Sequence, residues 1–298
     1  MLPFGPTAMF RVHFQRPAPI LERYVQFYIQ RELHLRDPLL VQSVPARPAP
    51  MLEFVFGDPI KIRYPGSSVE VESPGAVVVG MLTRPHGELR LQGTLTSFVI
   101  MFHPAGLSTL FPVALRELTD RDYDACSVAG KPIAELEQRL ADCDTFASRA
   151  SAADAFLARR IPDYLNTDRL SIAIDVILAR DGRVRMPELA AYSGIGNRQF
   201  DRMFGERFGM RPKLYARIVR FQSALDCKAR SSRKSWTDVA HEFGYHDQMH
   251  MIHDFEEFTG ETPTETLRLV EMFFRQQIEA IRIGKGTKDS RPVRRFVI

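Results

Sequence analysis

The pattern of apolar and polar positions divides the chain into a strand-rich first half and a helical second half. Between about residues 50 and 104, short runs of β-branched and aromatic residues are separated by Pro and Gly turns. The runs are Leu52–Phe56, Ile60–Tyr64, Val69–Val71, Ala76–Val79, Glu88–Leu91 and Ser97–Phe102. Runs of this length and spacing predict a small β-barrel or sandwich.

Helical spacing flanks the β-rich stretch. Apolar residues three and four positions apart predict helices over residues 134–140 and 146–164, and those of residues 20–34 fit roughly one helical face. Residues 166–168 (Asn-Thr-Asp) provide the N-cap of a further helix, which ends at Asp181-Gly182. We therefore place a domain boundary near residue 166.

An internal repeat organises the second half. The matching sets are Leu189–Gly194 with Val239–Gly244, at an offset of 50, and Phe204, Gly209 and Pro212 with Phe255, Gly260 and Pro263, at an offset of 51. Each copy predicts a short helix with a buried Ala, a turn that contains Gly, and a second helix, which together make a helix-turn-helix unit. Residues 213–230 predict a helix that connects the two units.

These patterns predict an α+β fold in two domains with a tail. Residues 1–166 would form an N-terminal domain, a small β-barrel or sandwich with helices. Residues 167–271 would form an all-α domain of two helix-turn-helix units joined by a connecting helix. Residues 272–298 would form a basic C-terminal tail, in which Lys285 to Arg295 could add phosphate contacts or be a solvated terminus.

Charge is distributed unevenly along the helical half. Residues 183–234 contain 13 Lys/Arg and 4 Asp/Glu, whereas residues 235–271 contain 1 and 9. A compact basic segment is typical of a surface that binds a polyanion, and a solvated helix is the alternative.

Composition excludes several other classes of protein. No window approaches 18 uncharged apolar residues, so we expect no membrane span, and the start lacks the pattern of a secretion signal. Three cysteines that lie far apart exclude a disulfide framework or a zinc site as the organising principle. They fit a reducing compartment, so we expect a cytoplasmic protein.

At this point the sequence resembles the AraC/XylS family of bacterial transcription regulators over about residues 167–270. In the first unit, the residues that carry the resemblance are Pro187–Ala190, Arg198–Phe204 and Phe208–Pro212. In the second unit they are Val239-Ala240, Phe243–Tyr245, Asp247-Gln248, His250, Phe255 and Phe258–Pro263. The N-terminal half, with Leu52–Pro59, Gly80–Pro85 and Phe102–Leu107, is similar to the N-terminal domains of one AraC-like subset. The resemblance implies a transcription regulator that binds double-stranded DNA.

In a helix-turn-helix unit the second helix enters the major groove, and its early exposed residues reach base edges. In the first unit this helix should span about residues 196–207. Its outward residues would be Asn197, Arg198, Asp201 and Arg202. Arg198 and Arg202 could reach guanine or phosphate, or pair with Asp201 and Glu206, and Asn197 could read adenine or cap the helix. Arg211, Lys213, Arg217 and Arg220 are predicted to lie on the surface or to position phosphates.

The second unit departs from the family pattern. Its second helix should span about residues 247–258, with Gln248, Met249, Ile252 and His253 outward. Gln248 could read adenine, and Met249 could touch a thymine methyl group. Asp254, Glu256 and Glu257 would repel phosphates, so we expect the first unit to dominate affinity. The second unit would then read DNA weakly, stay off it, or dock against a protein.

Other candidate sites favour structural roles. His246, His250 and His253 have the spacing of metal ligands on a helix, but a structural or surface role fits them better than a metal site. No site for another cofactor is predicted. His86 and His103 are isolated, and Cys126 or Cys143 would be a buried small side chain rather than a redox sensor. A set of apolar residues at strand spacing fits core better than an effector pocket: Met51, Phe54, Phe56, Phe98, Met101 and Phe102. No nucleophile signature or phosphate-binding loop points to an enzyme.

We therefore expect a regulator with DNA, a small-molecule effector, RNA polymerase and a second copy of the chain as candidate partners. Two alternatives stay open. One is a ligand-binding or catalytic β-barrel protein whose helical half binds proteins. The other is a DNA-binding protein without an effector.

Overall fold

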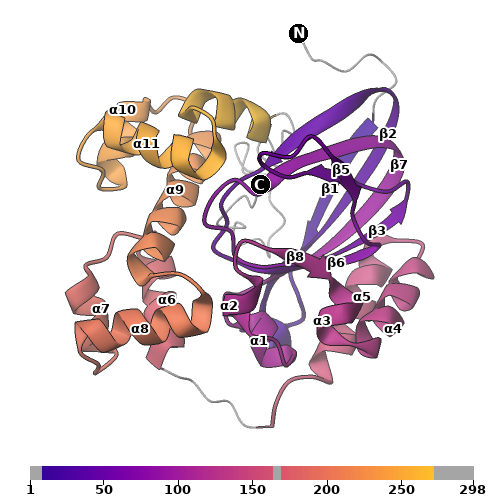
Figure 1. The fold of residues 1–298 in the computed structure, drawn as a ribbon, viewed down its shortest axis with the longest axis horizontal. Helices are drawn as coiled ribbons and strands as arrows, with labels where there is room; N and C mark the ends of the chain where they lie inside the picture. The colour runs from indigo at the N-terminus through magenta and orange to yellow at the C-terminus, as the bar shows by residue number, and fades with distance from the viewer. Residues whose placement is uncertain (1–8, 164–168, 272–298) are drawn as a thin grey trace. The chain divides into compact units, whose positions relative to one another are not determined.

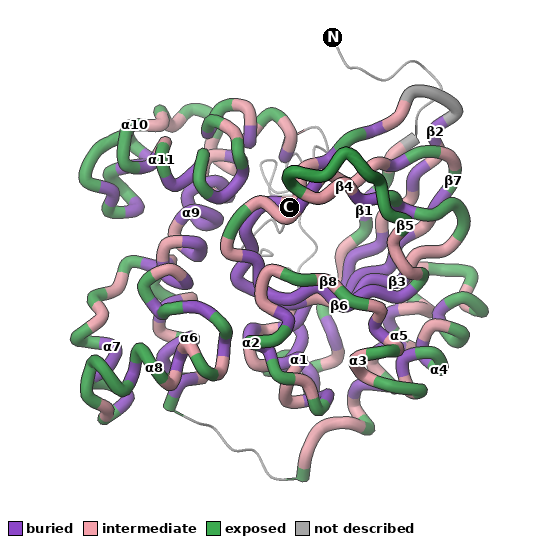
Figure 2. Tube along the Cα trace, in the orientation of Figure 1, coloured by how far each residue is buried: buried purple, intermediate pink, exposed green. Residues whose placement is uncertain are grey.

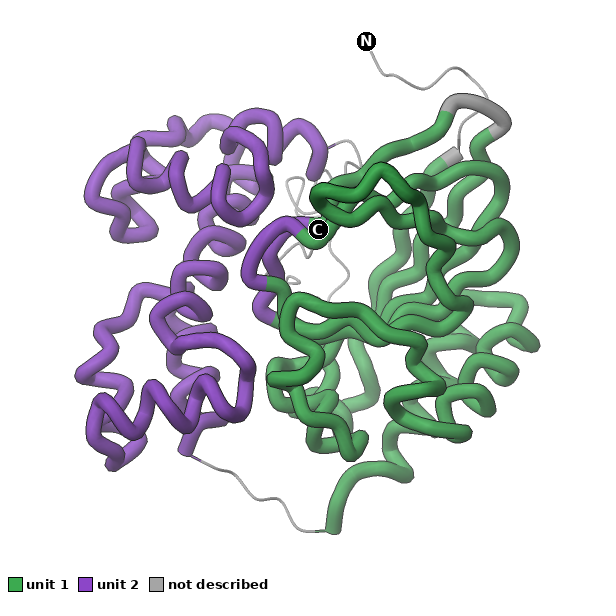
Figure 3. The backbone as a smooth tube through the Cα atoms, viewed as in Figure 1, with its two compact units in different colours: residues 1–44, 49–82, 86–166 green, residues 45–48, 83–85, 167–298 purple. Residues whose placement is uncertain are grey.

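The chain folds into two compact units in a computed structural model that describes residues 9–163 and 169–271. Unit 1 comprises residues 1–44, 49–82 and 86–166. Unit 2 comprises residues 45–48, 83–85 and 167–298 (Figure 3). Two short segments from the first half of the sequence thus belong to the unit that holds the helical half. The expected α+β class, with a β-rich N-terminal part and an all-helical C-terminal part, is confirmed.

Unit 1 is built on one eight-stranded antiparallel sheet (Figure 1). Its strands are β1 (Met9–Gln15), β2 (Val25–Val44), β3 (Met51–Gly57), β4 (Lys61–Arg63), β5 (Glu70–Glu72), β6 (Ala76–Val79), β7 (Gly87–Phe102) and β8 (Asp122–Asp124). The main strand order is β1-β2-β7-β3-β6-β8, and β4 pairs with both β7 and β5. The two longest strands, β2 and β7, pair at the centre of the sheet.

The prediction of a helix over residues 20–34 is wrong. Only Pro19–Leu21 form a short 3-10 helix (η1), and strand β2 begins at Val25. Tyr28 and Ile29, which point to opposite faces of β2, are both buried. A strand that is covered on both faces loses the alternation of apolar and polar residues by which strands are recognised.

Helices follow the sheet and cover one of its faces. They are α1 (Gly106–Leu110), α2 (Leu115–Leu118), α3 (Ala125–Ala129), α4 (Lys131–Ala141) and α5 (Phe146–Ala158). The hydroxyl of Tyr28 donates to Asp154 of α5 over 2.7 Å. The ring of Phe146, at the start of α5, packs 6.2 Å from that of Phe98 in β7. These contacts fix α5 against the central strands.

The opposite face of the sheet carries a buried ion pair among apolar residues. Arg31 of β2 pairs with Glu53 of β3, whose side chain is 6% exposed. The guanidinium of Arg31 also donates to the hydroxyl of Ser97 in β7 over 2.9 Å. Three neighbouring strands are thus joined by one polar cluster.

Unit 2 is helical in its described part. Its labelled helices are α6 (Arg169–Ala179), α7 (Met186–Tyr192), α8 (Asn197–Phe208), α9 (Pro212–Arg230), α10 (Trp236–Glu242) and α11 (Gln248–Thr259). Residues 263–271 are helical as well. The N-cap expected at residues 166–168 and the tail at 272–298 lie outside the described residues. In the described part of the chain, no helix is long and apolar enough to cross a membrane.

Candidate nucleic-acid interface

The internal repeat is preserved in the turns between helices. Gly194 and Gly244 have φ of +61° and +68°, a backbone conformation that glycine adopts without strain. In the first turn, the N–H of Ile195 donates to the carbonyl of Ala190 over 3.1 Å. In the second turn, Tyr245 donates in the same way to Ala240 over 2.9 Å. Both α7-α8 and α10-α11 are therefore helix-turn-helix units with equivalent turns.

The second helices of the two units end in the same way. Gly209 after α8 has a φ of +71°, and Gly260 after α11 has a φ of +78°. Their N–H groups donate to the carbonyls of Gly205 and Glu256, over 2.9 Å in each case. Because the glycines are 51 residues apart, this offset aligns α8 with α11 residue by residue.

Helix α8 buries one face and exposes the other (Figure 2). Phe200, Phe204 and Phe208 are at most 1% exposed, and the ring of Phe204 lies 4.7 Å from that of Phe208. This aromatic stripe anchors the helix in the unit. The predicted outward residues are all exposed: Asn197, Arg198, Asp201 and Arg202.

The polar contacts of α8 bear on the alternatives predicted for these side chains, which are DNA contact, helix capping and ion pairing within the helix. Gly196 is the N-cap and makes no side-chain cap, so Asn197 is the first residue of the helix and not its cap. Arg202 donates to Glu206 over 2.9 Å on the solvent side. Within residues 169–271, no ion pair joins Asp201 to Arg198. Arg198 thus presents its guanidinium to solvent at the start of the helix.

Arg211 and Lys213 lie at the start of the connecting helix α9. Arg211 is its N-cap residue and is exposed, and Lys213 is exposed one residue after Pro212. Both residues come within five positions of the end of α8, so exposed basic side chains lie on α8 and at the start of α9.

Helix α11 exposes different chemistry in the same arrangement. Gln248, Met249 and His253 are exposed as predicted, whereas Ile252 is half-buried. The hydroxyl of Thr237 in α10 donates to the amide oxygen of Gln248 over 2.8 Å. No Lys or Arg occurs in α11.

The N-terminus of α11 differs from that of α8. Asp247 is its N-cap, and its carboxylate accepts from the N–H of His250 over 2.7 Å. At the start of α8 the equivalent residue is Gly196, which has no side chain to cap the helix. A carboxylate therefore stands at the start of α11, where it would oppose a phosphate.

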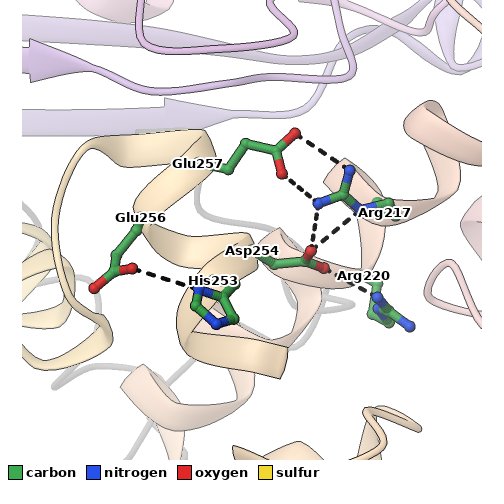
Figure 4. A network of polar contacts seen from close by, with 6 residues as sticks. All are labelled: Arg217, Arg220, His253, Asp254, Glu256 and Glu257. Carbon is green, nitrogen blue, oxygen red and sulfur yellow. Dashed lines mark hydrogen bonds and ion pairs between the residues drawn. The ribbon is translucent and has the colours of Figure 1, made fainter. Parts of the chain in front are cut away.

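Asp254 of α11 is the centre of a buried polar network (Figure 4). Its side chain is 1% exposed, and Arg217 of α9 donates to it over 2.6 Å. Arg220 donates to its other oxygen over 3.0 Å. Arg217 also pairs with Glu257 at 2.6 Å, and the guanidinium of Arg220 lies 4.0 Å from the ring centroid of Tyr245. The network ties the connecting helix to the second unit.

This network corrects two expectations from the sequence. Arg217 and Arg220 were predicted to position phosphates or to lie on the surface, but both are bound to Asp254. Burial lowers the pKa of Arg217, but hydrogen bonds to Glu257 and Asp254 outweigh burial and raise it. Asp254 was predicted to repel phosphates, but its charge is compensated inside the fold. The acidic character of the second unit at its surface is therefore weaker than its residue count implies.

The remaining candidates give no second site. In the described ranges, no group of three or more His, Cys, Asp or Glu residues could hold a metal ion. The ring of His250 packs edge-on at 5.5 Å from Tyr245, which gives it a structural role. Cys126 and Cys143 are free and half-buried rather than buried. Burial, followed by Asp124 and Glu137, raises the pKa of the Cys126 thiol and so lowers its share of reactive thiolate.

His86 is not isolated, contrary to the expectation from the sequence. Its Nε2 lies 2.7 Å from the carboxylate of Asp122, and the hydroxyl of Tyr64 donates to both oxygens of the same carboxylate over 2.8 and 2.9 Å. The ring of Tyr64 packs edge-on against His86 at 5.5 Å. These residues join three segments of unit 1.

Residues 169–271 thus carry two helix-turn-helix units on one connecting helix, a motif whose second helix enters the major groove in DNA-binding proteins. A family model described as a helix-turn-helix domain matches residues 189–269, and a model described as a domain of unknown function (DUF6597) matches residues 13–124. The helical domain thus matches a helix-turn-helix family over residues 189–269, which agrees with the resemblance of this part of the sequence to the AraC family.

Solved structures of ToxT from Vibrio cholerae are similar to this chain. An apo variant has 10% identity and a TM-score of 0.49, and the match covers 81% of this chain and 97% of that chain. Wild-type ToxT with a bound unsaturated fatty acid has 12% identity and a TM-score of 0.45, with 90% and 98% covered. The comparison with curated proteins gives no match.

Proposed function

We propose that the protein recognises specific DNA sequences mainly through its first helix-turn-helix unit. The observation that carries this proposal is the outer face of α8. There, Arg198 and Arg202 are exposed four residues apart on a helix that Phe200, Phe204 and Phe208 anchor. Two guanidinium groups at this spacing suit the O6 and N7 acceptors of guanine or adjacent phosphates.

Each exposed side chain of the first unit has a role in this proposal. Asn197 and Arg198, at the start of α8, would contact base edges, with Asp201 and Arg202 beside them. Arg202 would exchange its solvent-side partner Glu206 for DNA. Arg211 and Lys213 would bind phosphates, which sets affinity and register rather than sequence preference. The second unit would add a smaller contribution through Gln248, Met249 and His253.

The N-terminal domain, residues 1–166, would sense an effector or mediate dimerisation. A bound signal would shift the population of molecules in which residues 167–271 are placed to bind DNA. RNA polymerase and a second copy of the chain are further partners in this proposal, in a cytoplasmic setting and without catalysis.

The test is genome-wide DNA selection with the purified protein, repeated with the double variant Arg198→Ala and Arg202→Ala. We expect a recovered motif that the double variant loses. Glu206→Ala is the matched control, because it removes the partner of Arg202 on the same helix and leaves both arginines in place. A motif that the double variant retains in full would contradict the proposal. A steep fall of affinity with salt is expected for DNA binding and not for a protein-interaction module.

A further inference from the structure

The two recognition helices can be aligned residue by residue. The 51-residue offset between Gly209 and Gly260 places Met249 where α8 has Arg198, and His253 where α8 has Arg202. The same offset aligns Phe204 with Phe255, and both are fully buried. The outer face of α11 therefore occupies the position of a base-reading face, but it carries an apolar side chain in place of an arginine.

Met249 is the exposed apolar residue of this face. It is 57% exposed, whereas Met251, Phe255 and Phe258 of the same helix are fully buried. Ile252 lies half-buried one turn further along. Met249 thus presents an apolar side chain to solvent at the position where α8 presents Arg198. Contact with an apolar group of a partner would remove this surface from water, which is favourable.

The outer face of α11 lacks the positive side chains that bind phosphates, so apolar contact is one means by which it could recognise DNA. α11 contains no Lys or Arg, and the two arginines of α9 closest to it are bound to Asp254. The face therefore cannot obtain much affinity from phosphates. However, the acid that lies deepest, Asp254, is neutralised, and Glu257 is paired with Arg217. Two of the acids of α11 are therefore compensated, and the carboxylate of Asp247 is the one that stands at the start of the helix.

The C5-methyl group of thymine is the apolar group that the major groove presents, and unbranched or methyl-bearing side chains contact it. Gln248 stands beside Met249, and its amide oxygen accepts from Thr237. This hydrogen bond engages the amide oxygen of Gln248, so the amide N–H groups are its donors toward a further partner. Those N–H groups can donate to thymine O4 or adenine N7, but guanine also presents acceptors, so the preference for A·T rests on the thymine methyl group.

We propose that the second helix-turn-helix unit reads A·T base pairs through contact between Met249 and a thymine methyl group, with Thr237 positioning Gln248 beside it. This inference rests on the proposed function, because it requires that the first unit hold the protein on its site. The second unit then contributes sequence preference with little salt dependence, which separates its role from that of the first unit.

The experiment uses the full chain and the DNA motif recovered by selection. Each thymine in the half-site of the second unit is replaced in turn by deoxyuridine, which lacks only the methyl group. Dissociation constants are measured for the wild type and for Met249→Ala on both DNAs. At one position, we expect uracil to weaken the wild type about fourfold, the value that corresponds to one buried methyl group. Met249→Ala should bind both DNAs equally there, and Met249→Leu should retain most of the preference.

Ile172→Ala is the matched control, because Ile172 is also an exposed apolar residue of unit 2 (43%) but lies on α6, outside both recognition helices. It should leave the thymine preference unchanged. Thr237→Ala should weaken binding to the A·T site, and Thr237→Ser should restore it, since serine keeps the hydroxyl.

Two results would overturn the inference while the proposed function stands. One is a wild type that binds uracil and thymine equally at every position of a recovered motif. The other is a loss for Met249→Ala that is the same on both DNAs, because such a loss would not depend on the methyl group. If no motif is recovered, or if Arg198→Ala with Arg202→Ala leaves binding intact, the proposed function fails and the inference fails with it.

Discussion

The guanidinium of Arg217 lies 2.6 Å from the carboxylate of Asp254, and that carboxylate is 1% exposed. By the 51-residue offset, Asp254 occupies the place that Met203 has in α8. The second helix-turn-helix unit thus has a charged residue on its inner face where the first has an apolar one. Two arginines of α9 compensate the charge of Asp254. This relationship explains why a count of acidic residues overstates the negative charge on the surface of the second helix-turn-helix unit.

Substitution of Asp254 should destabilise unit 2 strongly. Asp254→Ala leaves Arg217 and Arg220 without their buried partner, and the loss of one member of a buried ion pair costs about 3–5 kcal/mol. Both arginines are partly exposed, so we expect the lower end of this range. Urea unfolding, followed by circular dichroism, measures the change.

Glu257→Ala is the control for this prediction. Glu257 binds the same Arg217, but its side chain is 50% exposed, and exposed pairs contribute about 1 kcal/mol or less. Equal losses of stability in the two variants would show that Asp254 is not the centre of the network.

Asp122 should make the stability of unit 1 depend on pH in the acid range. Burial would raise the pKa of its carboxyl, but hydrogen bonds from His86 and Tyr64 outweigh burial and lower it. A carboxyl with a lowered pKa in the folded state stabilises the fold above the pKa of the unfolded chain, about 3.9 for Asp. That stability is lost as pH falls through the folded pKa.

The free energy of unfolding of the wild type should therefore fall more steeply below about pH 4 than that of Asp122→Asn. Urea unfolding of both proteins between pH 7 and pH 3 gives the comparison. Parallel curves for the two proteins would contradict the role of Asp122.

Arg211 and Lys213 should affect DNA binding differently from Arg198. Arg211→Ala or Lys213→Ala should weaken binding to all sequences alike and reduce the slope of log affinity against log salt by about 1. Arg198→Ala should cost about 1–3 kcal/mol on the best site and relax the preference at one position. Titrations on matched and mismatched duplexes at several salt concentrations separate the two effects. A change of sequence preference in Arg211→Ala would assign that residue to base contact.

Two glycines of unit 2 should respond in opposite directions to alanine. Gly182 has a φ of +74°, and an added Cβ would lie 2.2 Å from the carbonyl oxygen of Ala216. Gly182→Ala should therefore lower the melting temperature clearly. Gly205 lies inside α8, and nothing stands within 4 Å of its added Cβ. Gly205→Ala should stabilise by about 1 kcal/mol, the difference in helix propensity between the two residues. Thermal unfolding of both variants tests the pair.

The repeat in the sequence predicted the recognition helices closely. The helix predicted over about 196–207 is α8, and that predicted over 247–258 is α11, each displaced by one residue. The glycine and aromatic positions predict where these helices lie, because each helix-turn-helix unit needs glycine in its turn and aromatic residues in its core. The exposure of the nine predicted contact residues followed from the same periodicity, whereas their roles on DNA remain predictions.

Other features depended on partners distant in the sequence. The burial of Asp254 requires Arg217 and Arg220, which lie 37 and 34 residues earlier. The alignment of Asp254 with Met203 is a signal that could have found it, because Met203 is apolar and half-buried in α8. Strand β2 was misassigned because Tyr28 and Ile29, which point to its opposite faces, are both buried, and such a strand shows no alternation of apolar and polar residues. The pairing of His86 with Asp122 depends on strand order, which local pattern does not specify.

Two arginines of α9 are bound within the second unit, so the positive side chains that solvent meets belong mainly to the first unit. Residues 169–271 consequently have an electric dipole that runs from one helix-turn-helix unit to the other. Under the proposed function, the field of a duplex would turn this dipole before any contact forms. The first helix-turn-helix unit would then reach the phosphates first, and the second would sample only the few base pairs within its reach.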